Sequence, residues 1–231
     1  MPQNKKFRLG ILGGMSPEAG VLLQQLIIRA TPAQCDQDHI AVVTFTNPHI
    51  PDRSRSLAED GGVAYLQAVI ESLHLLEKCE VDLIVMACNT AHARLSEIEK
   101  AVHTPILNMV GLAKARIVAE DGKVAILATD GTVGNGLFTL PENPTKTLRP
   151  SPSLQKRIMA VIHAVKAGTP SAELIAPMKS VIDTLRTHGA TAFLLGCTEL
   201  SVLHDPLIEH CDVTFIDPLR LAALRVVKST L

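Results

Sequence analysis

The sequence predicts an α/β fold made of two similar lobes, each a parallel β-sheet flanked by helices. Strand and helix patterns alternate along the chain, which favours parallel strands joined by helical crossovers. Residues 81–86 are apolar almost throughout, as is typical of a strand buried on both faces of such a sheet. The 231 residues are 47% hydrophobic and 19% charged, so they can bury a large core, and intrinsic disorder is excluded.

The first half begins with an apolar strand pattern that ends in two glycines. Ser16 and Pro17 then provide an N-cap and a first helical residue, which predicts a helix that ends before Pro32. The segment 46–55 contains two prolines and is expected to be a loop. The remaining periodicities predict strands at 8–12, 40–45, 81–86 and 105–107, and further helices at 61–79, 90–100 and 111–120.

The second half starts the same alternation again. Its patterns predict strands at 123–127, 192–195 and 213–216, and helices at 154–168 and 172–189. The proline-rich segment 141–152 is expected to be a surface loop.

Two cysteines mark an internal repeat. Cys88 and Cys197 each follow a strand pattern and one small residue, and they are 109 residues apart. Asn108 and Asp217 close the next strand patterns and are separated by the same 109 residues. Two apolar strand patterns can resemble each other by chance. Chance much less often places a cysteine at the same position after both strands. We therefore expect two duplicated α/β halves that face each other.

Composition excludes several classes of partner. The net charge is −1 with no basic run, and there is no Trp, one Tyr and five Phe, so nucleic-acid binding is not expected. The apolar stretches are shorter than the ~20 residues that span a bilayer. The first seven residues contain charge but no apolar core of a signal peptide, so we expect a cytoplasmic protein without membrane contact.

Metal and nucleotide cofactors have no sequence support. The five cysteines are odd in number, widely spaced and without a C-x-x-C pair, which argues against a disulfide framework and excludes a zinc ribbon. Gly10, Gly13 and Gly14 lack the dinucleotide-binding spacing, and no P-loop is present. We expect neither a cofactor nor a bound metal. Three cysteines without a repeat partner, Cys35, Cys79 and Cys211, are expected to be structural.

The paired cysteines lie where chemistry is expected. Ligands of open parallel sheets bind beyond the carboxyl ends of the strands, and a helix start there favours a thiolate. A disulfide is uncommon in this compartment. A metal needs more ligands, and His92, four residues after Cys88, has no counterpart after Cys197. The remaining possibility is acid–base work by two thiols on opposite faces of one carbon, as inversion of a stereocentre requires.

Four segments together resemble the aspartate/glutamate racemase family. They are Gly13-Gly14-Met15-Ser16-Pro17-Glu18-Ala19, Ile50-Pro51-Asp52-Arg53-Ser54, Ala87-Cys88-Asn89-Thr90-Ala91-His92 and Gly196-Cys197-Thr198-Glu199-Leu200. The resemblance implies a pyridoxal-free amino-acid racemase with its active site between two α/β lobes. We place these lobes at residues 1–103 with 210–231 and at residues 104–209. A homodimer is common for this architecture.

The resemblance also separates branches of the family. Glutamate racemases typically carry Asp-Ser at the first motif and a histidine at the last, where this chain has Met15-Ser16 and Glu199. The chain is therefore closer to the aspartate or broad-specificity branch. Both cysteines are present, which favours true racemisation. Phe138 stands where many members are expected to have a tyrosine, which leaves the substrate side chain open.

Substrate contacts can be assigned residue by residue. An α-carboxylate needs backbone N–H groups and small hydroxyls, which the loop of Met15 and Ser16 can provide. Further groups of this kind are Asn89, Thr90, Thr129, Gly131, Thr132 and Thr198, and the neighbouring Glu199 is also expected to contact the substrate. A side-chain carboxylate needs a cation, for which the family implies Arg53 and Lys166. From its position alone, Lys166 is a cation at a helix C-terminus.

The sequence therefore predicts a racemase that interconverts L- and D-aspartate, glutamate or both, with Cys88 and Cys197 as alternating base and acid. Three alternatives stay open: a related racemase or isomerase of another substrate, a non-catalytic amino-acid-binding protein, and a redox sensor that joins the two cysteines.

Overall fold

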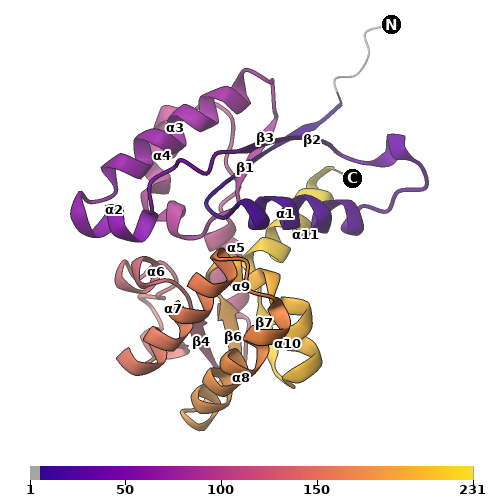
Figure 1. Cartoon of the computed structure of the whole chain (residues 1–231). Coiled ribbons are helices and arrows are strands. Elements are labelled where there is room, and N and C mark those ends of the chain that lie inside the picture. Colours follow the sequence, from indigo (N-terminus) through magenta and orange to yellow (C-terminus); the bar gives the residue numbers. More distant parts are fainter. Residues whose placement is uncertain (1–5, 231) are drawn as a thin grey trace, which may run out of the picture.

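The computed structural model describes residues 6–230, which form two α/β lobes, one above the other in Figure 1. The first lobe contains a parallel sheet of three strands in the order β2-β1-β3, and the second a parallel sheet of four in the order β5-β4-β6-β7. Their bounds are β1 Arg8–Gly13, β2 Ala41–Thr46, β3 Leu83–Met86, β4 Lys123–Leu127, β5 Thr147–Leu148, β6 Ala190–Leu195 and β7 Thr214–Ile216. The predicted fold class is confirmed.

Helices cover both faces of each sheet. The α-helices that begin before residue 120 are α1 Pro17–Ala30, α2 Arg53–Glu59, α3 Val63–Glu77, α4 Leu95–Ala101 and α5 Met109–Val118. The later ones are α6 Asp130–Gly134, α7 Pro152–Lys166, α8 Ser171–Thr187, α9 Thr198–Val202, α10 His204–His210 and α11 Pro218–Thr230. Short 3-10 helices occupy Asp36–Asp38, Thr90–Arg94 and Pro144–Lys146. None of the helices within residues 6–230 has the length and hydropathy that a membrane crossing requires.

The apolar strands are buried because side chains alternate between two covered faces. Leu9 and Ile11 of β1 pack toward α1 and α11, whereas Leu12 packs toward α3. In the second sheet, Phe193 of β6 packs toward α7 and α8, and Leu194 packs toward α5. All five side chains are fully buried, so each sheet is a rigid support for the loops at its carboxyl end.

The two lobes exchange one helix each. Helix α5 follows the first lobe in the chain, yet its inner face packs on the second sheet. Helix α11 follows β7 of the second sheet and packs against α1 of the first lobe, where Figure 1 shows it in yellow. We placed residues 210–231 with the first lobe, and those bounds stay a prediction. Within them, β7 pairs with β6 in the second sheet, and α11 lies on the first lobe.

Several predicted elements differ from the observed ones. The loop predicted at 46–55 ends early, because the Asp52 side chain accepts a hydrogen bond from the Arg55 amide and starts α2. The predicted helix 90–100 begins as a 3-10 turn, and the predicted strand 105–107 is a single bridge between Ile84 and Ile106. The predicted loop 141–152 contains the edge strand β5. This strand has only two residues, too few to produce a recognisable strand pattern in the sequence.

One close contact between the lobes lies where α2 meets α6. A methyl group on Gly131 would lie 2.7 Å from the Ser54 Cα and 2.6 Å from its Oγ, so only glycine fits there. The Gly131 amide donates a hydrogen bond to Ser54 Oγ at 3.3 Å across this contact. The close approach brings the carboxyl ends of the two sheets together.

Gly131→Ala should therefore lower the free energy of unfolding by about 1–3 kcal/mol, as expected for overpacking. Gly134→Ala is the matched control, because no atom lies within 4 Å of its added methyl group and alanine favours a helix more than glycine does. Urea denaturation measures both variants. If Gly131→Ala unfolded at the same urea concentration as Gly134→Ala, the contact between α2 and α6 would not constrain the lobes.

Candidate active site

Cys88 and Cys197 occupy equivalent places past the ends of β3 and β6. The Ala87 amide donates to the Leu12 carbonyl at 2.9 Å, and the Gly196 amide donates to the Leu127 carbonyl at 2.7 Å. Each bond extends the pairing of a central strand by one residue and directs the next residue, a cysteine, to the sheet edge. The 109-residue offset therefore corresponds to the same position in two sheets.

The repeat also explains Asn108 and Asp217. Each is an N-cap: the Asn108 side chain accepts from the Gly111 amide at 2.7 Å, and Asp217 Oδ1 accepts from the Leu219 amide at 2.9 Å. They start α5 and α11, the two exchanged helices. Their role is thus to hold the lobes rather than to carry chemistry.

Both thiols line one cavity between the lobes, which we call the inner cavity. Each cysteine is 5% exposed. The inner cavity is lined by Met15, Asp52, Arg53, Ser54, Cys88, Asn89, Thr90, Thr129, Lys166, Cys197, Thr198 and Glu199. Ten of these twelve residues belong to the predicted site. The other two, Asp52 and Ser54, are neighbours of Arg53 in the sequence.

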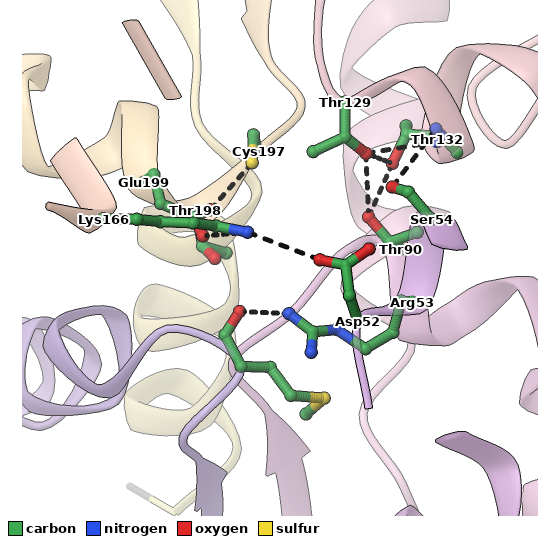
Figure 2. Close-up of polar contacts among 12 residues, drawn as sticks. Asp52, Arg53, Ser54, Thr90, Thr129, Thr132, Lys166, Cys197, Thr198 and Glu199 are labelled. Atoms are coloured by element: carbon green, nitrogen blue, oxygen red, sulfur yellow. Dashed lines mark hydrogen bonds and ion pairs between the residues drawn. The ribbon is translucent and has the colours of Figure 1, made fainter. Parts of the chain in front are cut away.

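Cys197 is held by Glu199. The thiol donates to Glu199 Oε2 at 2.7 Å, and Glu199 is itself 2% exposed (Figure 2). Burial and then the Glu199 carboxylate raise the pKa of the Cys197 thiol well above its usual value. The prediction that the helix start favours a thiolate is therefore wrong for Cys197, because α9 has only five residues and its dipole is outweighed. Cys197 is a protonated thiol at neutral pH.

Lys166 lies between two carboxylates at the edge of the inner cavity. Its ammonium is 3.4 Å from Glu199 Oε1 and 3.8 Å from Asp52 Oδ2, distances of ion pairs rather than of direct hydrogen bonds (Figure 2). Burial lowers the pKa of Lys166, but the neighbouring acidic groups, Glu199 foremost, together raise it more, so the lysine stays charged. The C-terminal end of α7, where Lys166 is the last helical residue, places this cation opposite α2 of the other lobe.

Arg53 is fixed by backbone carbonyls. Its guanidinium donates to the carbonyls of Met15 at 2.7 Å, Pro51 at 3.0 Å and Ile50 at 3.3 Å, and the residue is only 8% exposed. These bonds join the two loops that follow β1 and β2. A guanidinium has five N–H donors, so donors remain for a ligand in the inner cavity.

The Asn89 amide is buried without a partner. Neither its oxygen nor its nitrogen makes a hydrogen bond among the described residues, although Asn89 is 1% exposed and lines the inner cavity. An orphaned buried amide is costly unless a ligand satisfies it.

Thr198, on the opposite lobe, donates from Oγ1 to the Ala87 carbonyl at 3.3 Å and so ties the start of α9 to the Cys88 loop.

Three threonine hydroxyls form a closed ring across the lobes. Thr90 Oγ1 lies 3.1 Å from Thr129 Oγ1 and 2.9 Å from Thr132 Oγ1, and the latter two are 3.1 Å apart (Figure 2). Thr90 and Thr129 line the inner cavity, whereas Thr132 and Gly131 lie behind them and outside the lining. The ring gives each hydroxyl a partner within the protein, and a ligand could replace one of these partners.

Ser16 lies outside the inner cavity. It lines a second, larger space, which we call the outer chamber. The outer chamber is lined by Gly14, Met15, Ser16, Pro17, Glu18, Pro48, Ile50, Asp52, Arg53, Val165, Lys166 and Gly168. Ser16 is the N-cap residue of α1 but its side chain makes no capping hydrogen bond. Of the predicted loop, only Met15 reaches both spaces.

Two further residues have clear roles. His92 Nδ1 is 2.8 Å from the Cys88 carbonyl, and burial lowers the pKa of the imidazole, so a neutral ring orients the Cys88 loop. Asp52 was not among the predicted site residues. Its place between two prolines and an arginine marked a loop, and only the fold shows that it faces Lys166. Within residues 6–230, no group of three His, Cys, Asp or Glu side chains could hold a metal ion.

Two known racemases are similar to this chain in sequence, one over nearly the whole chain and the other over two thirds of it. Broad specificity amino-acid racemase RacX of Bacillus subtilis is 24% identical over 217 residues, which are 90% of this chain and 92% of that protein. Glutamate racemase of Deinococcus radiodurans is 29% identical over 160 residues, which are 67% of this chain and 53% of that protein. The chain thus spans about half the length of the latter relative.

Solved structures agree with these sequence relatives. Picrophilus torridus aspartate racemase superposes with a TM-score of 0.84 and 30% identity, over 97% of this chain and 94% of that chain. Glutamate racemase isoform RacE1 from Bacillus anthracis, with a TM-score of 0.70 and 19% identity, shares the fold over 98% of this chain and 82% of that chain. The Asp/Glu/hydantoin racemase family matches residues 12–226. The chain therefore belongs to the Asp/Glu/hydantoin racemase family and is an amino-acid racemase.

Proposed function

We propose that this racemase interconverts the L and D forms of aspartate, glutamate or both, by proton transfer between two thiols and without a cofactor. The observation that carries the proposal is the pair of buried cysteines at equivalent strand ends of facing sheets, both lining one cavity. Racemisation needs a base on one face of Cα and an acid on the other. Two thiols provide both functions and exchange them when the reaction runs backwards.

One catalytic event moves two protons. The thiolate of one cysteine takes the α-proton, and the electron pair of the broken C–H bond spreads into the α-carboxylate. The second cysteine then donates its thiol proton to the opposite face of Cα. Cys197 starts as the thiol in the major resting form, because burial and its hydrogen bond to the Glu199 carboxylate keep the proton on its sulfur. After turnover the two cysteines have exchanged protonation states.

The weak acidity of the α-proton requires stabilisation of the charge that develops on the α-carboxylate. The unpartnered Asn89 amide, together with the hydroxyls of Thr90, Thr129 and Thr198, supports a carboxylate position on the inner side of the cavity. Buried, fixed donors are most effective for this purpose, since they do not reorganise as the charge forms. We assign Gly131 and Thr132 to support Thr90 and Thr129 from behind.

Two cations support a position for the side-chain carboxylate. Arg53 and Lys166 lie at the end of the inner cavity that adjoins the outer chamber. The planar guanidinium of Arg53 is suited to bidentate binding of a carboxylate, and the backbone carbonyls that hold it reduce the entropy lost on binding. We assign Glu199 to Cys197 and Lys166 rather than to the substrate, as a positioning residue.

The remaining expectations concern the setting of the enzyme. We propose a cytoplasmic homodimer that binds a small amino acid and neither nucleic acid nor membrane, in agreement with the net charge of −1 and the absence of basic runs in the sequence. Light scattering during size-exclusion chromatography measures the assembly.

Cys88→Ser and Cys197→Ser should each lower racemisation by about 10²–10⁴-fold, the contribution of a positioned acid or base. Circular dichroism follows racemisation of each enantiomer, and mass spectrometry follows deuterium uptake at Cα from heavy water. Cys79→Ser, an exposed cysteine, is the control. Full activity of either site variant in both directions would exclude two-thiol chemistry. A wild-type protein that incorporates no deuterium would be a binding protein.

Glu199→Gln should move the alkaline limb of the pH profile to lower pH. The carboxylate raises the pKa of Cys197, so its loss lowers that pKa, and the thiol that must act as acid is deprotonated sooner as pH rises. The profile of kcat/KM shows this shift equally for both enantiomers, since the equilibrium constant of a racemisation is one. Glu209→Gln, an exposed substitution on the same lobe, is the control. An unmoved alkaline limb would mean that Glu199 does not control the thiol.

A further inference from the structure

Four residues line both the inner cavity and the outer chamber: Met15, Asp52, Arg53 and Lys166. They mark the boundary where the two spaces adjoin. Met15, Asp52 and Arg53 come from the first lobe and Lys166 from the second. The ion pair between Asp52 and Lys166 spans this boundary from one lobe to the other, as the dashed line in Figure 2 shows.

Lys166 is held in a way that permits exchange of partners. Its distances to Asp52 Oδ2 and Glu199 Oε1 are 3.8 and 3.4 Å, so neither carboxylate forms a close hydrogen bond with the ammonium. The Lys166 side chain is 32% exposed and that of Asp52 is 49% exposed, whereas that of Glu199 is 3% exposed. Asp52 is thus the partner that water can replace, and Glu199 is the permanent one.

Asp52 is fixed in place by the start of α2. Its Oδ1 accepts from the Arg55 amide at 2.9 Å, which leaves Oδ2 to face Lys166. Burial raises the pKa of Asp52, but the Arg55 amide and the charges of Arg53 and Lys166 lower it more, so the group is ionised. A carboxylate of the protein therefore stands beside the cation that the proposed function assigns to the substrate side chain.

We propose that Asp52 is a specificity-determining residue which holds the position at Lys166 that the side-chain carboxylate of an acidic amino acid takes on binding. The inference rests on the proposed function of the inner cavity. Entry of an acidic amino acid exchanges one carboxylate at Lys166 for another, and water then solvates Oδ2 of the half-exposed Asp52 while Oδ1 keeps its bond to the Arg55 amide. On release, Asp52 takes Lys166 back. The residue thus weakens the binding of substrate and product alike and keeps product release fast.

The test is the pair of variants Asp52→Asn and Lys166→Met, alone and combined. Asparagine is as good an N-cap as aspartate, so α2 keeps its start while the competing charge is lost. We expect the KM of Asp52→Asn for aspartate and glutamate to fall about two- to fivefold, the range for a partly exposed ion pair, with no rise in kcat. Lys166→Met should raise KM. Adding Asp52→Asn to Lys166→Met should then leave KM unchanged, because the competition acts only through the lysine.

Glu59→Gln is the matched control, since it removes an exposed charge from α2 that pairs with Arg55 and not with Lys166. Its KM should equal that of the wild type. An unchanged or raised KM in Asp52→Asn, or the same fall in the Lys166→Met background, would overturn the role of Asp52. Asparagine as ligand should gain nothing from Asp52→Asn, because it has no side-chain carboxylate.

Calorimetry separates this inference from the proposed function. If the wild type binds L-aspartate or D-glutamate but incorporates no deuterium at Cα, racemisation of these substrates fails, and the two- to fivefold change in Kd still tests Asp52. If neither the wild type nor Asp52→Asn binds either ligand, the role of Asp52 is wrong as well. A lower Kd in Asp52→Asn, lost in the double variant, supports it.

Discussion

The parallel pairing of β1 with β3, and of β4 with β6, determines where the chemistry of this molecule can occur. In the first sheet β3 continues its hydrogen bonding to β1 one residue past its end, at Ala87, and in the second sheet β6 does the same to β4 at Gly196; the next residue in each case is a cysteine. Neither cysteine can be moved without breaking a sheet that is covered on both faces. The exchange of α5 and α11 then turns the two carboxyl edges toward each other. Rigid strands therefore position the two sulfur atoms more reliably than loops could.

Charge in the cleft is balanced with few groups. Arg53 and Lys166 contribute two positive charges, and Asp52 and Glu199 contribute two negative ones, around a cavity that adjoins an open chamber. These charged side chains differ in how firmly the protein holds them. Arg53 is bound to three carbonyls, Glu199 is buried against a thiol, and Asp52 is half exposed. Lys166 forms ion pairs with both acids, and its charge also acts on Cys197, whose pKa it lowers.

The resting cleft satisfies most of its polar groups internally. Threonine hydroxyls of the two lobes bond to one another, and the arginine bonds to the backbone. Asn89 is the exception, with both ends of its amide buried and unpaired among the described residues. Burying such a group costs free energy that a bound carboxylate and amino group can return. The stability lost at Asn89 is therefore available as binding energy at the reacting end of the ligand.

The sequence by itself determined the α/β class, the two parallel sheets and the equivalence of Cys88 and Cys197, because hydrophobic periodicity and a repeated landmark are local properties of the chain. It also identified ten of the twelve residues that line the inner cavity. It did not determine that Ser16 and Thr132 lie outside the inner cavity, that Asp52 faces Lys166, or that the Cys197 pKa is raised. These properties depend on burial and on distances between side chains from different lobes. Only the packing of α2 against α6 and of α11 against α1 decides them.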